Sequence, residues 1–213
     1  FTQCRALKRV TLPECAGCEL YGCRSLECIG LFPSAGMSRT TVDGVLMDRE
    51  QTRLLRYPPH RPGSRYRVPE TVTEIAAGAF SDCTFLEEII LPPKLQWIPF
   101  RCFQRAQSLR AIDFPSEVRG IAADAFEECT ALEELHIPPH ITQIGRGAFC
   151  GCRSLKKVTL PWELTACSRA FEGCSALTDV YLIGEGRRWC NRKLLRDNFP
   201  KGVRRHYIAP SEV

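Results

Sequence analysis

The chain has 213 residues, of which 44% are hydrophobic and 25% are charged, an ordinary composition for a globular protein. No apolar run approaches the roughly 20 residues that a membrane-spanning helix needs, so the sequence predicts no such span. The net charge of +5 comes entirely from residues 184–213, which hold eight basic and three acidic residues. Strong nucleic-acid binding would need basic residues along the main face of the fold, together with aromatic side chains on which bases stack. The sequence does not show this pattern, so we interpret the basic residues as solvated surface and expect no nucleic-acid binding.

The first predicted elements are two short strands in residues 1–31, each inside a recurring apolar pattern. The pattern F-x-x-C-x-x-L-x-x-V-x-L-P is carried by Phe1, Cys4, Leu7, Val10, Leu12 and Pro13, and a copy shortened to 19 residues by Leu20, Cys23, Leu26, Ile29 and Leu31. Alternating apolar positions with β-branched residues favour a strand at the V-x-L segment. The pattern starts in the middle of a unit, so we expect at least half a repeat upstream.

Four of the 13 cysteines, at positions 15, 18, 23 and 28, are concentrated in the 16-residue stretch 13–28 of this region. The spacing C-x2-C-x4-C-x4-C matches the paired knuckles of zinc sites poorly. Cys23 also occupies the inward position of the repeat, which is filled elsewhere by Cys4, Cys83, Ala106, Cys129, Cys152 and Cys174. Because alanine serves there equally well, we interpret these thiols as small buried apolar groups and predict no metal ion. A Cys15–Cys18 disulfide stays open as an alternative for an oxidising compartment.

Residues 32–67 interrupt the pattern with an insertion that predicts a β-hairpin. Two strands are expected, Thr41 to Met47 and Thr52 to Tyr57, around a polar turn. Seven arginines against three acids would suit an anion-binding flap. We favour the alternative that the apolar residues of the hairpin pack it on the flank of the fold.

Residues 68–182 repeat with a period of 23 residues. The period is marked by Phe80, Phe103, Phe126 and Phe149, with Phe171 one residue early. Each unit continues as C-x-x-L-x-x-I-x-L-P, followed by a second apolar pair such as Leu95 and Ile98. One such unit cannot bury its own apolar side, whereas stacked units share a continuous core. The sequence therefore predicts a solenoid.

After Leu182 the pattern stops, and residues 183–213 are expected to form a C-terminal cap. Residues 187–197 suit a short helix, and Val203 to Ile208 a last strand. A solenoid has to cover the open end of its core, so its terminal units are atypical.

The segments IAAGAFSDCTFLEEIILPPKLQWI and IGRGAFCGCRSLKKVTLPWEL resemble BspA-like leucine-rich repeats. The DGVL and RYP elements of the insertion resemble an island common in that family. The resemblance implies a single right-handed α/β repeat solenoid, with a parallel sheet on its concave face and short helical turns opposite. It also implies a cell-surface protein that adheres to host or matrix proteins, whereas the many free cysteines favour a reducing cytoplasm.

No catalytic arrangement can be argued from the sequence, and we expect neither an enzyme nor a cofactor. His136 and His140 are four residues apart, but the intervening prolines exclude the helical face of a zinc-protease motif. What remains is the row of residues that flank the central apolar residue of each strand and point away from the core. From this row we predict a partner-binding site made of Glu88, Asp113, Glu134, His136, Lys157 and Tyr181, with exposed Trp97 and Trp162 beside it.

The leading interpretation of function is a monomeric, non-enzymatic protein-interaction or adhesion module that binds a protein partner through this concave face. The acidic middle of the row favours a partner with a basic patch. Two alternatives stay open: the face is merely solvated, or the solenoid is a structural spacer without its own ligand inside a larger protein.

Overall fold

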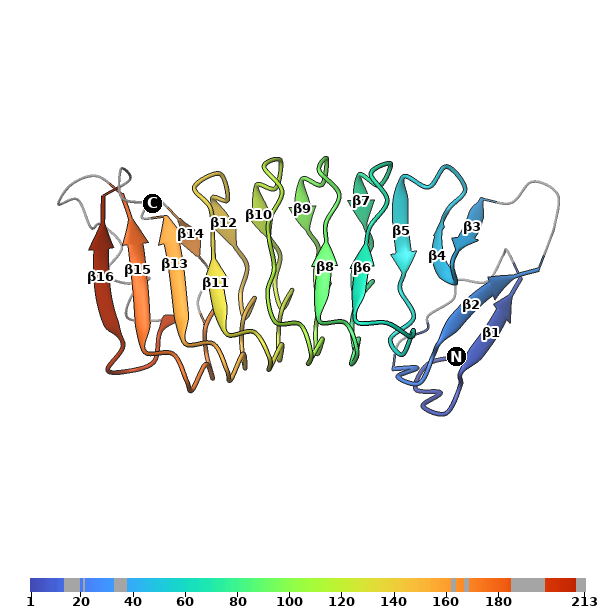
Figure 1. Cartoon of the computed structure of the whole chain (residues 1–213), viewed down its shortest axis with the longest axis horizontal. Helices are drawn as coiled ribbons and strands as arrows, with labels where there is room; N and C mark the ends of the chain where they lie inside the picture. The colour runs from blue at the N-terminus through green and yellow to red at the C-terminus, as the bar shows by residue number, and fades with distance from the viewer. Residues whose placement is uncertain are drawn as a thin grey trace.

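A computed structural model describes residues 1–13, 20, 22–32, 38–161, 164–166, 169–184 and 198–209. Successive coils of the chain lie side by side along one long axis, from the N-terminal strands to strand β16 (Figure 1). The predicted solenoid of stacked parallel strands is therefore confirmed. None of the described segments forms a helix long and apolar enough to cross a membrane.

The first sheet is formed by the I-x-L segments of the repeat. Its strands are β6 (Arg65–Arg67), β8 (Glu88–Ile90), β11 (Glu134–His136), β13 (Lys157–Pro161), β15 (Asp179–Ile183) and β16 (Arg204–Ile208). All pairings are parallel. Strand β6 pairs with β8, and in the second group β11 pairs with β13, β13 with β15 and β15 with β16. Between these two groups Ala111–Asp113 takes the place of a strand without being assigned as one, so the sheet is interrupted there.

A second parallel sheet follows from the second apolar pair of each repeat. It contains β9 (Trp97–Ile98), β10 (Gly120–Ile121), β12 (Gln143–Ile144) and β14 (Thr165–Ala166), with β7 (Glu74–Ile75) in the same repeat position. In β9, β10 and β12 the second residue is directed inward: Ile98, Ile121 and Ile144 are all buried. A coil that carries strands of both kinds, such as β8 and β9, therefore contributes to two sheets.

The expected short helical turns are absent from the described coils, and this part of the prediction is wrong. On the third side of each coil alternate backbone N–H groups bond to the next coil, and those between them close tight turns within their own coil, such as Gln104 N–H to Arg101 O at 3.1 Å. Phe103 N–H donates to Ala125 O at 2.7 Å and Arg105 N–H to Glu127 O at 2.7 Å. Arg101 and Arg105 also have φ values of 54° and 58°, a left-handed conformation that a right-handed helix does not contain.

The core is organised around a column of phenylalanine rings. Phe80, Phe103, Phe126, Phe149 and Phe171 are fully buried or nearly so, and Phe199 extends the column. Neighbouring rings stack with centroids 4.9–5.4 Å apart and planes within 15° of parallel. Offset stacking of this kind adds to the stabilisation that burial alone gives. The marker of the period is thus also the axis of the core.

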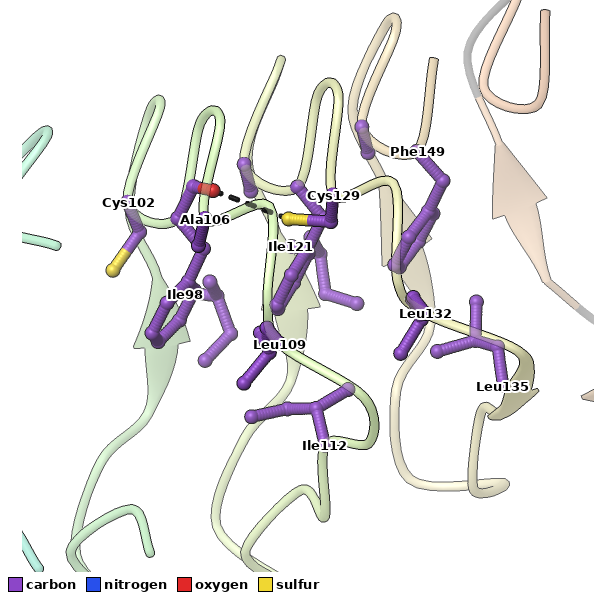
Figure 2. Close-up of a cluster of buried hydrophobic side chains, with 14 of the residues drawn as sticks. Ile98, Cys102, Ala106, Leu109, Ile112, Ile121, Cys129, Leu132, Leu135 and Phe149 are labelled. Atoms are coloured by element: carbon purple, nitrogen blue, oxygen red, sulfur yellow. Dashed lines mark hydrogen bonds between the residues drawn. The ribbon is translucent and has the colours of Figure 1, made fainter. Parts of the chain in front are cut away.

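Beside this column the repeat thiols form a second one. The thiol of Cys129 donates to the carbonyl of Phe103 at 3.2 Å, as Figure 2 shows. Cys152 and Cys174 make the same bond, also at 3.2 Å, to the phenylalanine of the coil before. The thiols are therefore small apolar groups with a hydrogen-bonding role that the sequence did not predict.

Most of the cysteine predictions that the structure tests are confirmed. Cys23 and the repeat cysteines from Cys83 onward are buried, and all nine described cysteines are free thiols. Burial raises the pKa of Cys83 to about 12. Cys4 is exposed, contrary to the prediction of an inward position, because no described coil covers it. The predictions for Cys15 and Cys18 lie outside the described residues.

The N-terminal register is confirmed. Strands β1 (Arg9–Leu12) and β2 (Cys28–Leu31) pair in parallel, with Val10 opposite Ile29. Their apolar residues form a separate small cluster together with Leu46 of the insertion. The main cluster extends from Val45 to Leu182. The insertion therefore connects two cores.

The insertion contains four strands instead of the expected two. Three of them are β3 (Arg39–Val42), β4 (Val45–Asp48) and β5 (Arg53–Arg56), and the fourth is β6, which belongs to the first sheet. The expected strand from Thr41 to Met47 is wrong because Asp43 and Gly44, with φ values of 50° and 78°, make a tight hairpin turn inside it. Strand β5 then pairs in parallel with β7, so the hairpin lies in line with the coils and not on their flank (Figure 1).

A buried arginine fastens this insertion to the first full coil. The Arg56 guanidinium donates to the backbone carbonyl of Gly78, to the Ser81 hydroxyl at 2.8 Å and to the Ser81 carbonyl at 3.3 Å. Arg56 is only 9% exposed, so one of the seven arginines is part of the packing and not of an anion-binding surface. This supports the packing interpretation of the insertion.

At the C-terminal end the predicted last strand is present as β16, which pairs with β15. The Asn198 side-chain oxygen accepts a bond from Ala170 N–H at 2.8 Å, and Phe199 stacks on Phe171. The expected helix at 187–197 lies outside the described residues.

Candidate functional site

The outward side chains of the first sheet form the surface on which the predicted site residues lie. We call this surface, the outward positions of β6, β8, Ala111–Asp113, β11, β13, β15 and β16, the ladder face. Alternation along β11 is direct: Glu134 and His136 are exposed while Leu135 between them is buried. Asp113 is also exposed, and Glu88, Lys157 and Tyr181 are half-buried. All six predicted residues therefore lie on one face.

The C-terminal half of the ladder face is a connected set of contacts. The ammonium of Lys157 lies 4.9 Å from the centroid of the Tyr181 ring, and that ring stacks on His206 with centroids 4.4 Å apart. His206 Nε2 is 2.7 Å from Asp179 Oδ1, and Arg204 donates to Asp179 Oδ2 at 2.8 Å. The structure thus brings Lys157 and Tyr181 together, and His206 of the last strand packs on the Tyr181 ring.

Asp179 is the electrostatic centre of this group. Hydrogen bonds from His206, then Arg204 and Thr178, lower the pKa of its carboxyl group to about 2. Asp179 was not among the six predicted site residues, and sequence reasoning did not find its partners. The offset of 25 residues between Asp179 and Arg204 departs from the 23-residue period, so the register alone did not reveal the pair.

In the N-terminal half, Glu88 and Asp113 line one cavity of about 360 Å³. Arg65 neutralises Glu88 across an N–O distance of 2.6 Å, and Arg110 pairs with Glu87 at 3.2 Å. Ile90, which is 40% exposed, forms an apolar wall of the same cavity. The middle of the face is therefore less acidic than its sequence indicates.

The remaining predicted residues are neighbours across the next pair of strands. Glu134 is in register with Lys157, and His136 with Thr159. Among the described ion pairs neither Asp113 nor Glu134 has a partner, so these two carboxylates carry the negative charge of the face. They are separated from the Asp179 group by strand β13.

A second hollow lies outside the ladder face, next to strand β9, and sequence reasoning missed it. This groove has a volume of about 870 Å³. Trp97, which was predicted to be exposed beside the ladder face, lines it and is 42% exposed. Trp162 lies outside the described residues.

Within the described ranges, no three His, Cys, Asp or Glu side chains gather in a way that would hold a metal ion. His140 Nε2 lies 3.1 Å from the carbonyl oxygen of Pro115, whereas His136 is directed to solvent from β11. The two histidines thus have different surroundings.

Comparison with solved structures places the coils in a known class of solenoid. The pneumococcal vaccine antigen PcpA is 24% identical over 94% of this chain and 51% of its own, with a TM-score of 0.78. A leucine-rich cell surface protein of Faecalibacterium prausnitzii is 26% identical over 93% of this chain and 52% of its own, with a TM-score of 0.79. A leucine-rich repeat protein of T. pallidum is 23% identical over 84% of this chain and 82% of its own, with a TM-score of 0.60.

The chain spans about half the length of the first two of these structures. No curated protein matches it. Residues 64–182 match six copies of the BspA-type leucine-rich repeat region. Repeats of this type are generally protein-interaction or surface modules without catalytic activity. The match covers more than half of the chain, and together with the coils described above it shows that this chain belongs to the BspA-type leucine-rich repeat family.

Proposed function

We propose that this chain is a non-enzymatic interaction or adhesion module that binds a protein partner through the ladder face. The observation that carries the proposal is the arrangement of that face: outward side chains in register on parallel strands on both sides of Ala111–Asp113, next to a cavity with an exposed isoleucine. A contiguous, preformed surface binds without the entropic cost of ordering loops. The cell-surface description of the similar F. prausnitzii protein supports an adhesive role.

The chemistry of the partner follows from the charges that have no ion pair. Asp113 and Glu134 favour a basic patch, while Ile90 offers an apolar contact at the cavity between Glu88 and Asp113. Lys157 and Tyr181 would contact the partner beyond that patch, with His136 available for hydrogen bonds. Charges of this kind change the association rate and its salt dependence more than the final affinity.

The test uses the intact chain against a panel of immobilised host matrix proteins, followed by surface plasmon resonance. The reversals Asp113→Lys and Glu134→Lys, made together, should abolish binding that weakens as salt rises. Glu88→Gln tests the cavity separately. A neutral residue is chosen there because lysine at position 88 would place a second cation next to Arg65. The matched control reverses Glu50 and Glu70, two exposed acids in turns away from the ladder face. Equal loss in the control would contradict the proposal.

A structural spacer is the second candidate, favoured by one observation. The similar PcpA and F. prausnitzii chains are about twice as long as the part that this chain covers, so comparable solenoids occur inside longer proteins. The spacer predicts no binding by the intact chain to any panel member at any salt concentration. It also predicts that ladder-face reversals are silent.

A further inference from the structure

The groove beside β9 has a lining unlike that of the ladder face. Its polar side chains come from three successive coils: Thr73 and Glu74, then Lys94 and Gln96, then Ser116 and Glu117. Trp97 contributes the large apolar surface. A volume of about 870 Å³ lies at the upper end of the roughly 300–1,000 Å³ typical of small-molecule sites, with room for more than one sugar ring.

The position of the indole is fixed by the coil that follows. Trp97 is in register with Gly120 on the neighbouring strand β10. A Cβ atom at Gly120 would lie only 2.4–3.0 Å from three carbons of the six-membered ring, so the ring occupies the space that any other residue would fill. The missing side chain of Gly120 therefore lets the indole lie directly against strand β10, while 42% of Trp97 stays exposed. A large aromatic surface is preformed at the groove.

The charges of the lining are largely balanced. Glu74 pairs with Arg53 at 3.6 Å, Glu117 lies 4.0 Å from Arg119, and Lys94 is a cation in the same groove. A lining of this kind offers donors and acceptors in several directions without a strong field of one sign. It selects against a highly charged ligand and suits one rich in neutral hydroxyl groups.

We propose that this groove binds a neutral oligosaccharide. A pyranose ring has an apolar C–H face that packs on the exposed indole, and hydroxyl groups around its edge. Those hydroxyls bond to the Glu74 and Glu117 carboxylates, the Gln96 amide and the Thr73 hydroxyl. A protein partner would instead require a larger apolar centre than one tryptophan gives. The proposal is independent of the ladder face and of any protein partner.

The experiment is isothermal titration calorimetry of the intact chain with maltotriose, cellotriose and chitotriose, each to millimolar concentration. At least one should bind, and Trp97→Ala should weaken its affinity by about tenfold or more, because the stacking surface is lost. Trp97→Phe should retain part of the affinity. Gly120→Val, which displaces the indole, should weaken binding like Trp97→Ala, provided that its melting temperature stays near that of the parent chain.

The matched control is the double reversal Asp113→Lys and Glu134→Lys on the ladder face, which should leave sugar binding unchanged. Conversely, Trp97→Ala should leave any protein binding by the ladder face intact, so failure of one proposal is distinguishable from failure of the other. The oligosaccharide proposal is overturned if none of the three sugars binds. It is equally overturned if one binds but Trp97→Ala has no effect, or if only anionic sugars such as heparin fragments bind.

Discussion

Replacing Phe126 by alanine removes a ring from the middle of the phenylalanine column. Its side chain is fully buried, with ring centroids 5.0 Å from Phe103 and 5.1 Å from Phe149, and it meets Phe114 edge-on at 6.1 Å. Buried phenylalanine-to-alanine changes cost about 3–5 kcal/mol through lost burial and the cavity left behind. Two stacking partners place Phe126 at the upper end, so we expect a loss of about 4–5 kcal/mol.

The assay is urea denaturation followed by circular dichroism, with the free energy of unfolding extrapolated to water. Phe199→Ala is the matched control, because among the described residues that half-buried ring stacks on Phe171 alone, so its loss should cost less. Since domain stabilities are about 5–15 kcal/mol, the Phe126 variant should be close to unfolding at room temperature. A loss below about 2 kcal/mol, or one no greater than that of Phe199→Ala, would refute the view that the column is the axis of the core.

Three further predictions concern the thiols, the last strand and the cap. A bulky thiol reagent should label few cysteines in the native chain and all 13 after denaturation without reductant; stoichiometric zinc by elemental analysis would contradict this. The folded-state pKa of Asp179, about 2, lies below the unfolded value, so its stabilising contribution is complete above about pH 4 and is lost as the pH falls towards 2. The melting temperature should therefore fall more steeply in that window for the parent chain than for Asp179→Asn, and parallel curves would refute the assignment. Truncation after Leu182 removes Phe199 and β16 and exposes the apolar edge of the last coil, so aggregation or a clearly lower melting temperature is expected; a stable monomer by light scattering would argue against a cap.

The period made much of the fold predictable, because it links equivalent positions in every coil. The inward register of the phenylalanines and the strands of the first sheet up to β15 followed from it, whereas the last strand was predicted from the residues after the pattern stops. The same offset of 23 residues also separates the two partners of the ion pairs Arg65–Glu88 and Lys156–Glu133, which sequence reasoning did not predict. The outward placement of the six site residues was therefore predictable, while the neutralisation of Glu88 was available but missed.

Other features could not be predicted because they depend on backbone conformation that the residue types conceal. Arg101 and Asp124 adopt left-handed φ values at a position that glycine fills in other coils, so their side chains gave no signal against helical turns. The Asp43–Gly44 turn did carry a hairpin signal, but the apolar residues on both sides obscured it. The Trp97 groove depends on Gly120 one coil later, a relation that appears only once the coils are stacked.

The backbone bonds between coils also determine how this chain would respond to tension. In both sheets and on the turn side, these bonds join each coil to the next along the long axis. A pull on the two ends would therefore act along these hydrogen bonds and separate one coil at a time. It would not load all of the bonds together in shear. Each coil that detached would release 23 residues, or about 75 Å of extended chain. The solenoid would therefore lengthen in small steps at modest force and act as an extensible tether.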